Sequence, residues 1–395
     1  MTLLAQHGWG KSDKIETALH EKSVSGLIVS PRDETPDNAQ SLISSIASDY
    51  HDSVRLFDPL FHAGMITPAN AGKLPDYDYY RPNLTRRDFI GTAKYAGYAA
   101  DVLGFQYGLE VSAIVSPTIE LVNFGDSSAQ IALQLADASA EHHAGQTDGR
   151  PLLASFVINE NALGSRADLD AFLDAVTVMD ADGFYVVMSR ASSTHNPLVE
   201  PDRLAGLMYM VYILRVVNRF DVYCGYSDLI GLPLHAAGAT ATACGWAGTL
   251  RRFTFKRFRP PAGGRRPWPR YLSTPLLESV LISELDQLSE RGIIEGVLSN
   301  TNYDANFGTT NPHGVPWSGS IPALHHWAAL ADRIRAIESM SVEDAVTTLS
   351  DWIDTAETIR SNAEMLGVQF EPPSGDHLEM WRRAIEQFRD MVELT

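Results

Sequence analysis

The chain has 395 residues, of which 45% are hydrophobic and 20% are charged, values typical of a globular protein with a large core. The 31 Lys and Arg residues against 49 Asp and Glu give a formal net charge of −18, which argues against wrapping nucleic acid over the whole surface. Two cysteines, Cys224 and Cys244, exclude a disulfide framework, and no apolar run approaches the roughly 18 residues of a membrane span, so we expect a cytoplasmic protein without membrane contact.

The first 250 residues alternate short apolar or β-branched runs with helical patterns. Residues 26–30 (Gly-Leu-Ile-Val-Ser) are typical of a strand that is buried on both faces. The predicted strands cover residues 2–6, 26–30, 54–57, 111–115, 152–158, 184–188, 221–225 and 239–244. Eight strand–helix units in about 250 residues match the count, order and size of a (β/α)8 TIM-type barrel. An open doubly wound sheet has the same local signals but usually fewer strands.

The chain after the barrel divides into two further parts. We expect a barrel over residues 1–252, a basic aromatic linker over 253–272 and a C-terminal helical domain over 273–395. Apolar residues at helical spacing predict helices over residues 275–291, 321–337, 342–366 and 375–392. Residues 300–319 are rich in Asn, Gly, Thr and Pro and indicate an irregular loop.

Chemistry in such a barrel takes place where the strands end and the loops to the helices begin. Asp58, Glu120 and Glu160 follow the third, fourth and fifth strands and are the carboxylates best placed for general acid/base or nucleophilic work. Polar residues that follow strands are also common helix caps and loop residues, so that interpretation stays open for each of them. Ligand-binding candidates at the strand ends are His7, Trp9, Lys11, Asn159, Ser189, Arg190, Tyr226, Asp228 and Trp246.

The segment from Ala5 to Ser12 approaches a phosphate-binding loop, because Gly-Lys-Ser follows a strand and opens a helix. Ala5 stands where that motif requires glycine, so the defensible hypothesis is a helix N-terminus that holds a phosphate or carboxylate with Lys11. Simple packing of this segment is the alternative.

The twelve histidines form no recognisable metal-binding motif. The pairs at 142–143 and 325–326 lie in helical patterns, where adjacent residues point to different faces, and the two cysteines are isolated. We therefore expect no dedicated metal site and no cofactor.

One local segment contradicts the acidic balance of the chain. Residues 251–270 hold eight cations and no acid, interleaved with aromatic residues between 253 and 258. Cations pair with phosphates while rings stack on unpaired bases, which suits a single strand or loop of nucleic acid. The alternatives are docking on the acidic body or a protein partner, and a pocket for a small phosphorylated ligand. The cations are Arg251, Arg252, Lys256, Arg257, Arg259, Arg265, Arg266 and Arg270.

The second half of the barrel resembles that of the tRNA-guanine transglycosylases. The likeness covers roughly residues 150–252, and it is carried by the order and spacing of segments 151–156, 183–188, 222–227 and 234–239. The resemblance implies a protein that exchanges a guanine-type base in nucleic acid through a covalent Asp intermediate.

The sequence departs from that family at the residues that perform its chemistry. Ala243 stands in the best-matching register where the nucleophilic Asp of the family would be. The Cys-x-Cys-x-x-Cys zinc cluster and the Asp-Ser-Gly-Gly-Phe motif are missing, and the basic segment occupies the place of the cluster. No catalytic residue is therefore carried over, and a relative that binds a base without exchanging it fits the resemblance.

Three functions remain open at this point. The first is a transglycosylase-like barrel protein directed at a nucleobase or nucleic acid, with the cations of residues 251–270 guiding phosphates. The second is a metal-independent barrel lyase or hydrolase whose small phosphorylated substrate is anchored by Lys11, Arg251 and Arg252. The third is a non-catalytic subunit that binds a protein partner, or a second copy of itself, through the C-terminal helices.

Overall fold

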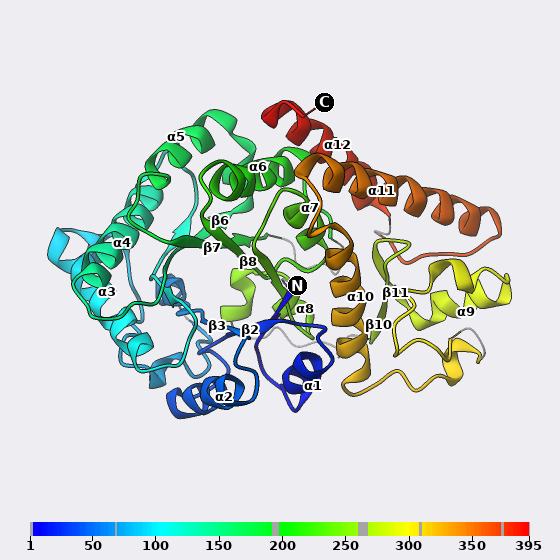
Figure 1. Cartoon of the computed structure of the whole chain (residues 1–395), viewed down its shortest axis with the longest axis horizontal. Helices are drawn as coiled ribbons and strands as arrows, with labels where there is room; N and C mark the ends of the chain where they lie inside the picture. The colour runs from blue at the N-terminus through cyan, green and yellow to red at the C-terminus, as the bar shows by residue number, and fades with distance from the viewer. Residues whose placement is uncertain are drawn as a thin grey trace.

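The computed structural model describes residues 3–67, 69–191, 197–259, 268–307, 310–372 and 375–394. Parallel strands form a nearly closed eight-position barrel, in the order β3-β2-β1-β9-β8-β7-β6-β4, with β5 also paired to β6 (Figure 1). The Ser112 amide donates to the Arg55 carbonyl at 2.7 Å, which links the β3 edge to the segment before β4. The strands are β1 (Leu3–Gln6), β2 (Gly26–Val29), β3 (Val54–Phe57), β4 (Ile114–Val115), β5 (Glu120–Leu121), β6 (Leu152–Asn159), β7 (Gly183–Ser189), β8 (Asp221–Gly225) and β9 (Ala241–Cys244).

The prediction of a (β/α)8 barrel is confirmed, with one difference in the fourth strand. The expected strand over residues 111–115 is reduced to β4, and its course is completed by β5 after a break. Pro117 lies in this break, and a proline cannot donate an amide hydrogen to a neighbouring strand. Both short strands pair with the long β6, so together they occupy one position of the barrel.

The strand register shows which side chains face the barrel interior. The Phe156 ring packs against Phe172 of helix α5 (Arg166–Val176), and the Phe184 ring packs against Phe220, so these residues point outward. Because side chains alternate along a strand, residues 155, 157 and 159 of β6 and residues 185, 187 and 189 of β7 point inward. The interior therefore carries Ser155, Asn159, Tyr185 and Ser189, which are polar, beside apolar residues.

Helices cover the outside of the barrel. Helix α2 shows the local logic: Thr35 caps its N-terminus by accepting from the Asn38 amide, Pro36 occupies the first turn, and Leu42, Ile43 and Ile46 are buried on one face. The final turn of α6 passes into a π-helical turn, Ile213–Val217. The helices of this layer are α1 (Lys14–His20), α2 (Pro36–Asp49), α3 (Thr92–Tyr107), α4 (Ser127–Ala144), α5, α6 (Pro201–Tyr212), α7 (Gly231–Ala236) and α8 (Gly248–Arg251).

The region after the barrel begins with a hairpin, so the helix expected over residues 275–291 is wrong in its first part. Antiparallel strands β10 (Arg270–Ser273) and β11 (Glu278–Leu281) precede helix α9 (Ile282–Glu290). Leu277 has a left-handed backbone (φ 51°) in the turn, and its neighbours that mimic helical spacing bury themselves in the hairpin. The remaining predicted helices are confirmed as α10 (Ile321–Ile337), α11 (Val342–Met365) and α12 (Asp376–Val392).

The long C-terminal helices share the hydrophobic core of the barrel. One cluster of buried side chains runs from the strands to Trp327 of α10, Ile353 of α11 and Trp381 of α12. A smaller cluster around Tyr271, Leu285 and other residues holds together the hairpin and α9, which lie beyond α10 in Figure 1. No helix in the described part of the chain is long and apolar enough to cross a membrane.

Candidate functional site

A polar layer lies at the mouth of the barrel, the end where the carboxyl termini of the strands meet. Asn159 is paired with Ser189 in the β6–β7 register, and Glu120 is paired with Val157 two residues earlier on β6. All three side chains therefore face inward at the mouth. Ser189 Oγ donates to Glu120 Oε1 at 2.6 Å, and Asn159 Nδ2 donates to the same oxygen at 2.9 Å.

A cavity of about 170 Å³ opens beside this carboxylate. The two donors bind Glu120 Oε1 and so set the orientation of the carboxylate. Among the described residues, none donates a hydrogen bond to its second oxygen, which can accept from a ligand. Arg190, Lys256 and Arg259 are the cations that line the space among the described residues, and the last two are exposed. The lining residues in the described part of the chain are Glu120, Asn159, Ser189, Arg190, Ala191, Thr254, Phe255, Lys256 and Arg259.

Asp58 is buried in the same mouth but does not line that cavity. Its Oδ2 accepts from the Tyr185 hydroxyl at 3.1 Å and its Oδ1 accepts from the Leu60 amide at 3.1 Å. Burial raises the pKa of Asp58 from 3.8 to about 6, although both hydrogen bonds and the Arg257 guanidinium favour the charged form. A carboxyl group with such a pKa is suited to proton transfer near neutral pH.

Glu160, the third predicted carboxylate, makes structural contacts. Its Oε1 accepts from the Ala191 amide at 2.8 Å, and its Oε2 lies 3.3 Å from Arg190 Nε and 3.9 Å from Arg203 Nη1. The structure therefore places Glu160 in an ion-pair network beside the mouth, where it holds the cavity-lining Arg190. The expectation of a catalytic role for Glu160 is not favoured by these contacts.

Residues 252–259, which we call the strap, fold back over the barrel mouth. The Arg190 amide donates to the Phe253 carbonyl at 2.9 Å, and Arg32 Nη2 donates to the Arg257 carbonyl at 3.1 Å. Three strap rings surround His62 with centroid distances of 5.1, 5.5 and 6.0 Å, and burial lowers the pKa of His62 to about 3. The ring contributors are Phe253, Phe255 and Phe258.

This arrangement corrects the expectation of base stacking for Phe253 and Phe258 of the basic segment, whereas Trp268 of the same segment is 77% exposed. Phe253 and Phe258 are completely buried, so their faces are not available to a nucleic acid strand. Phe255 is half-buried and lines the cavity, where its ring can contact a ligand. The alternation of cations and rings produces a strap that covers the barrel mouth, because Phe253 and Phe258 are buried in the core while Lys256 and Arg259 stay exposed.

The eight cations of the basic segment separate into three groups. Lys256 and Arg259 are exposed beside the cavity, whereas Arg265 and Arg266 lie outside the described residues. The others make internal contacts: Arg251 Nε donates to the Gly245 carbonyl, Arg270 pairs with Glu371, and Arg252 and Arg257 are buried. Burial lowers the pKa of Arg252 to about 10. The described cations of the segment therefore do not form one continuous phosphate-binding surface.

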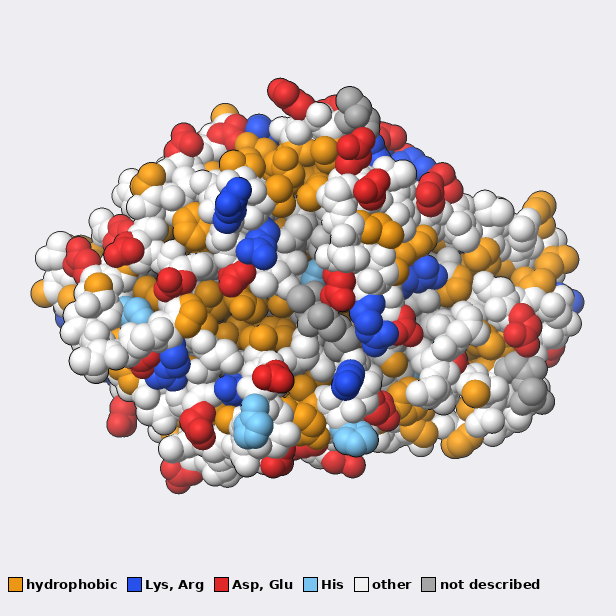
Figure 2. Space-filling view, in the orientation of Figure 1, with side chains coloured by type: hydrophobic (Ala, Val, Ile, Leu, Met, Phe, Trp, Pro, Cys, Tyr) orange, Lys and Arg blue, Asp and Glu red, His pale blue; other side chains and the backbone are white. Residues whose placement is uncertain are grey.

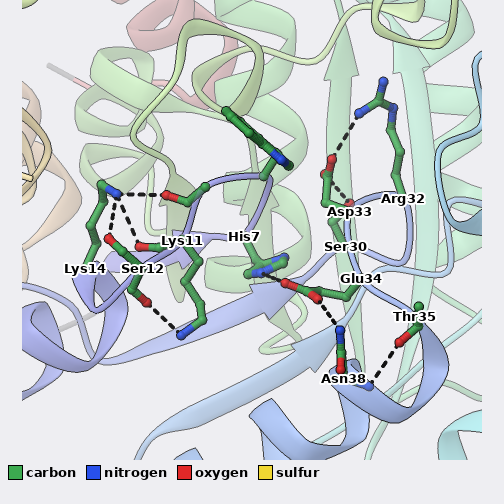
Figure 3. Close-up of polar contacts among 12 residues, drawn as sticks. His7, Lys11, Ser12, Lys14, Ser30, Arg32, Asp33, Glu34, Thr35 and Asn38 are labelled. Atoms are coloured by element: carbon green, nitrogen blue, oxygen red, sulfur yellow. Dashed lines mark hydrogen bonds and ion pairs between the residues drawn. The ribbon is translucent and has the colours of Figure 1, made fainter. Parts of the chain in front are cut away.

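Arg257 is the strap cation that enters the barrel mouth. Its Nη1 donates to the Tyr226 hydroxyl at 2.8 Å, and its Nη2 lies 3.5 Å from Asp33 Oδ2. Tyr226, a predicted ligand-binding residue, therefore uses its hydroxyl to hold the strap and does not line the Glu120 cavity. Asp33 also pairs with its neighbour Arg32 at 3.0 Å (Figure 3). The contacts of Arg257 with Asp33 and of Arg32 with the Arg257 carbonyl tie the loop after β2 to the strap.

In the predicted phosphate loop after β1, the lysine side chains bind groups of the loop itself and of the helix that follows it (Figure 3). Lys11 Nζ lies 2.6 Å from Glu16 Oε1 and donates to the Ser12 carbonyl, and Lys14 Nζ donates to the Gly10 carbonyl. The seven-residue helix α1 begins at Lys14, so Gly-Lys-Ser precedes the helix instead of opening it. These contacts do not support anion binding by Lys11.

The aromatic candidates near β1 form a separate group. His7 is buried, its Nε2 lies 3.4 Å from Glu34 Oε1, and its ring contacts Trp246 edge-on at 6.1 Å. Hydrogen bonding to His7 lowers the pKa of Glu34. Trp246 Nε1 donates to the Trp9 carbonyl at 2.9 Å, whereas the Trp9 ring is 82% exposed. None of these residues lines the Glu120 cavity.

Asp228 leaves the mouth and joins residues that the sequence did not connect to it. The 3-10 helix η6 (Asp228–Ile230) carries it outside the strand wall, where Asp228 Oδ1 lies 2.6 Å from His326 Nε2 of α10. Cys244 completes a buried group of three side chains with metal-binding donor atoms, the one such group among the described residues. The sequence placed these residues far apart, so it predicted no metal site.

A second cavity, of about 610 Å³, lies at the opposite end of the barrel. It is lined by Arg215, Thr240 and Met340 among others, from the loops that enter β8 and β9 and from α10 and α11. Chemistry in (β/α)8 barrels is located at the carboxyl ends of the strands. The smaller Glu120 cavity is therefore the better candidate for the site of function.

Sequence reasoning missed several residues that build the site. Tyr185 occupies an inward position of a correctly predicted strand, so the two-residue period of that strand could have indicated it. Thr254 and Phe255 reach the site because the strap folds over the mouth, and this folding has no local signal in the sequence. His62 follows β3, as Asp58 does, and lies against the strap rings. On the face shown in Figure 2, Lys and Arg side chains are interspersed with Asp and Glu.

A scan against protein-family models and a search of curated proteins each found no match to this chain.

Proposed function

We propose that the protein is a nucleobase-directed barrel protein that binds a nucleotide-type ligand at the Glu120 cavity. The observation that carries the proposal is the combination of an oriented carboxylate, an amide and a ring with exposed cations around one small space. Ligand cavities for drug-sized molecules measure about 300–1,000 Å³. A space of about 170 Å³ fits one ring system, with the remainder of the ligand outside.

The lining supplies the contacts that a nucleobase requires. The free oxygen of Glu120 accepts an N–H group of the base, as acidic side chains do with exocyclic amines and ring N–H groups. The Phe255 ring offers an apolar surface to the base. Lys256 and Arg259 are exposed at the cavity and attract a phosphate group of the ligand.

Glu120 is the carboxylate that this proposal assigns to chemistry on the ligand. It faces the cavity, whereas Asp58 lies under the strap and Glu160 is held by arginines. In glycosidic-bond cleavage, a carboxyl group in this position serves as general acid or base at the bond to the base. Base binding without exchange uses the same contacts.

The second candidate function is a lyase or hydrolase for a small phosphorylated substrate. It is favoured by the three cations that line the cavity, Arg190, Lys256 and Arg259. Arg190 is engaged with Glu160, so two cations remain for the phosphate. This candidate differs from the first in needing no base, and therefore no contact with Phe255.

A thermal-stability screen distinguishes the two functions. The full chain is heated with free nucleobases, nucleoside monophosphates, ribose 5-phosphate or inorganic phosphate. The first proposal expects nucleoside monophosphates to stabilise the chain more than ribose 5-phosphate does. A nucleoside monophosphate at 100 times its Kd raises the free energy of unfolding by about 2.7 kcal/mol. Equal stabilisation by ribose 5-phosphate supports the second candidate. No response to any of these ligands overturns both.

Paired substitutions locate the binding site. Glu120→Gln removes the acceptor charge, and we expect it to abolish most of the nucleotide-dependent stabilisation. Glu141→Gln, at an exposed position of α4 distant from the cavity lining, is the matched control and leaves the stabilisation unchanged. Stabilisation that survives Glu120→Gln unchanged contradicts the assignment of this cavity.

A further inference from the structure

Three side chains with metal-binding donor atoms converge between the barrel wall and helix α10. Asp228 follows β8, Cys244 is the last residue of β9, and His326 belongs to the first half of α10. Their donor atoms lie within 4.8 Å of one another, and all three side chains are buried. Since the residues come from three separate segments, the group exists only in the folded chain.

The strand register places Cys244 toward α10. Thr242, two residues earlier on β9, points outward because its hydroxyl lies 3.1 Å from His235 Nε2 of α7. Cys244 shares that outward face. The Cys244 carbonyl accepts from Trp327 Nε1 at 2.9 Å, so α10 is fixed against the end of β9 and brings the neighbouring His326 to the thiol.

The other two residues are also held in position. Asp228 has a left-handed backbone (φ 48°), a conformation that Asp adopts more readily than most other residues with a side chain. Asp228 Oδ1 lies 2.6 Å from His326 Nε2. The adjacent His325 instead meets Thr301 Oγ1 at 2.9 Å and the Leu272 carbonyl at 3.0 Å with its two ring nitrogens, so the neighbouring histidine has a structural role.

We propose that Asp228, Cys244 and His326 form a binding site for a divalent transition metal of the Zn²⁺ class. Zn²⁺ takes carboxylate, thiolate and imidazole ligands at about 2.0–2.3 Å in tetrahedral geometry, which puts neighbouring donors roughly 3.5 Å apart. The donors reach that arrangement when the Asp228–His326 pair, at 2.6 Å, opens to admit the ion and all three donor atoms turn toward it. Water completes the fourth position.

Binding exchanges protons for the metal. Cys244 releases its thiol proton and binds as thiolate, while His326 Nε2 becomes a ligand and the ring proton resides on Nδ1. The two anionic ligands balance the charge of the ion. Arg251 and Arg252 lie close enough to act on Asp228 electrostatically and repel a cation, so the site is weaker than a closed four-ligand zinc site.

The metal would join the barrel to the C-terminal helices. It bridges the ends of β8 and β9 to α10, the helix that also packs against β1. The expected effect is therefore on the stability of the whole chain, and the Glu120 cavity needs no metal. Failure of the metal proposal leaves the nucleobase proposal untouched.

Cobalt titration tests the site directly. The full chain is freed of metal with a chelator and titrated with Co²⁺, while the thiolate-to-cobalt charge-transfer band and the visible bands of tetrahedral cobalt are recorded. We expect saturation at one Co²⁺ per chain, loss of the bands on addition of Zn²⁺, and a rise in melting temperature with Zn²⁺. A wild-type chain that shows no thiolate–cobalt band overturns the proposal without any variant.

The two cysteines supply a matched pair of variants. Cys224 is buried in β8 and is not part of the group, so Cys224→Ser keeps the cobalt bands. Cys244→Ser loses the charge-transfer band, and His326→Gln weakens Co²⁺ binding by at least tenfold. Retention of the band in a folded Cys244→Ser chain contradicts the assignment, as does its loss in Cys224→Ser. If Cys244→Ser does not fold, the His326→Gln titration decides.

Discussion

Replacing Asp58 by Asn removes a charge that the barrel mouth disfavours. Burial raises the pKa of Asp58 from 3.8 to about 6, so between these pH values the folded protein retains a proton that the unfolded chain has lost. The free energy of unfolding therefore falls as the pH rises through this interval, and the ionised carboxylate costs about 3 kcal/mol at pH 8.

Asparagine resembles the neutral carboxyl group and retains an acceptor for the Leu60 amide. We expect Asp58→Asn to be more stable than the wild type by about 3 kcal/mol at pH 8 and by about 0.6 kcal/mol at pH 4. The gain at neutral pH is the free energy that the buried, ionised carboxylate costs the folded protein.

Urea denaturation between pH 4 and pH 8, followed by tryptophan fluorescence and circular dichroism, measures the difference between the two proteins. Asp52→Asn, at an exposed turn, is the control and shifts the unfolding free energy by no more than about 0.5 kcal/mol at each pH. A variant Asp58→Asn that is less stable at pH 8, or whose difference from the wild type does not change with pH, refutes the reasoning.

Two further predictions concern the strap and the space around the mouth. Arg257→Ala removes a buried guanidinium and lowers the unfolding free energy by about 3 kcal/mol. The control Arg259→Ala, at an exposed position of the same strap, changes it by less than about 0.5 kcal/mol. Equal effects of the two substitutions in urea denaturation would contradict the buried position of Arg257. Gly225→Ala places a Cβ 2.5 Å from the Tyr185 hydroxyl and destabilises the chain by about 1–3 kcal/mol, while Gly97→Ala in α3 meets no atom within 4 Å and stabilises it by about 0.5–1 kcal/mol. A Gly225→Ala chain with wild-type melting temperature would show that Tyr185 has room to move.

The barrel could be predicted because its strands are buried on both faces and hence leave continuous apolar runs in the sequence. Strands β3 and β8 have the predicted bounds, and α10 begins and ends as predicted. The hairpin of β10 and β11 was missed because Leu276 and Leu277, which lie in its turn, are by chance spaced from the apolar residues of β11 as they would be in a helix. Local periodicity does not distinguish a short apolar strand from a helix segment.

The candidate site could be predicted only in part. Glu120, Asn159 and Ser189 were found because they follow strands, and the barrel topology brings the ends of strands together. The strap was recognised as unusual, but its folding over the mouth depends on contacts with residues about 200 positions earlier, such as Arg32 and His62. A pattern confined to twenty residues contains no information about such distant partners.

The shared core of the barrel and the C-terminal helices has a consequence for the order of folding. Strand β1 has neighbours from opposite ends of the chain, since it pairs with β9 and packs against α10, more than 300 residues later. Strand β1 thus gains its contacts with α10 only after more than 300 further residues have been added to the chain. Contacts of such sequence separation slow folding. Folding of the barrel is therefore coupled to the C-terminal helices, because β1 is not fully buried before α10 is present.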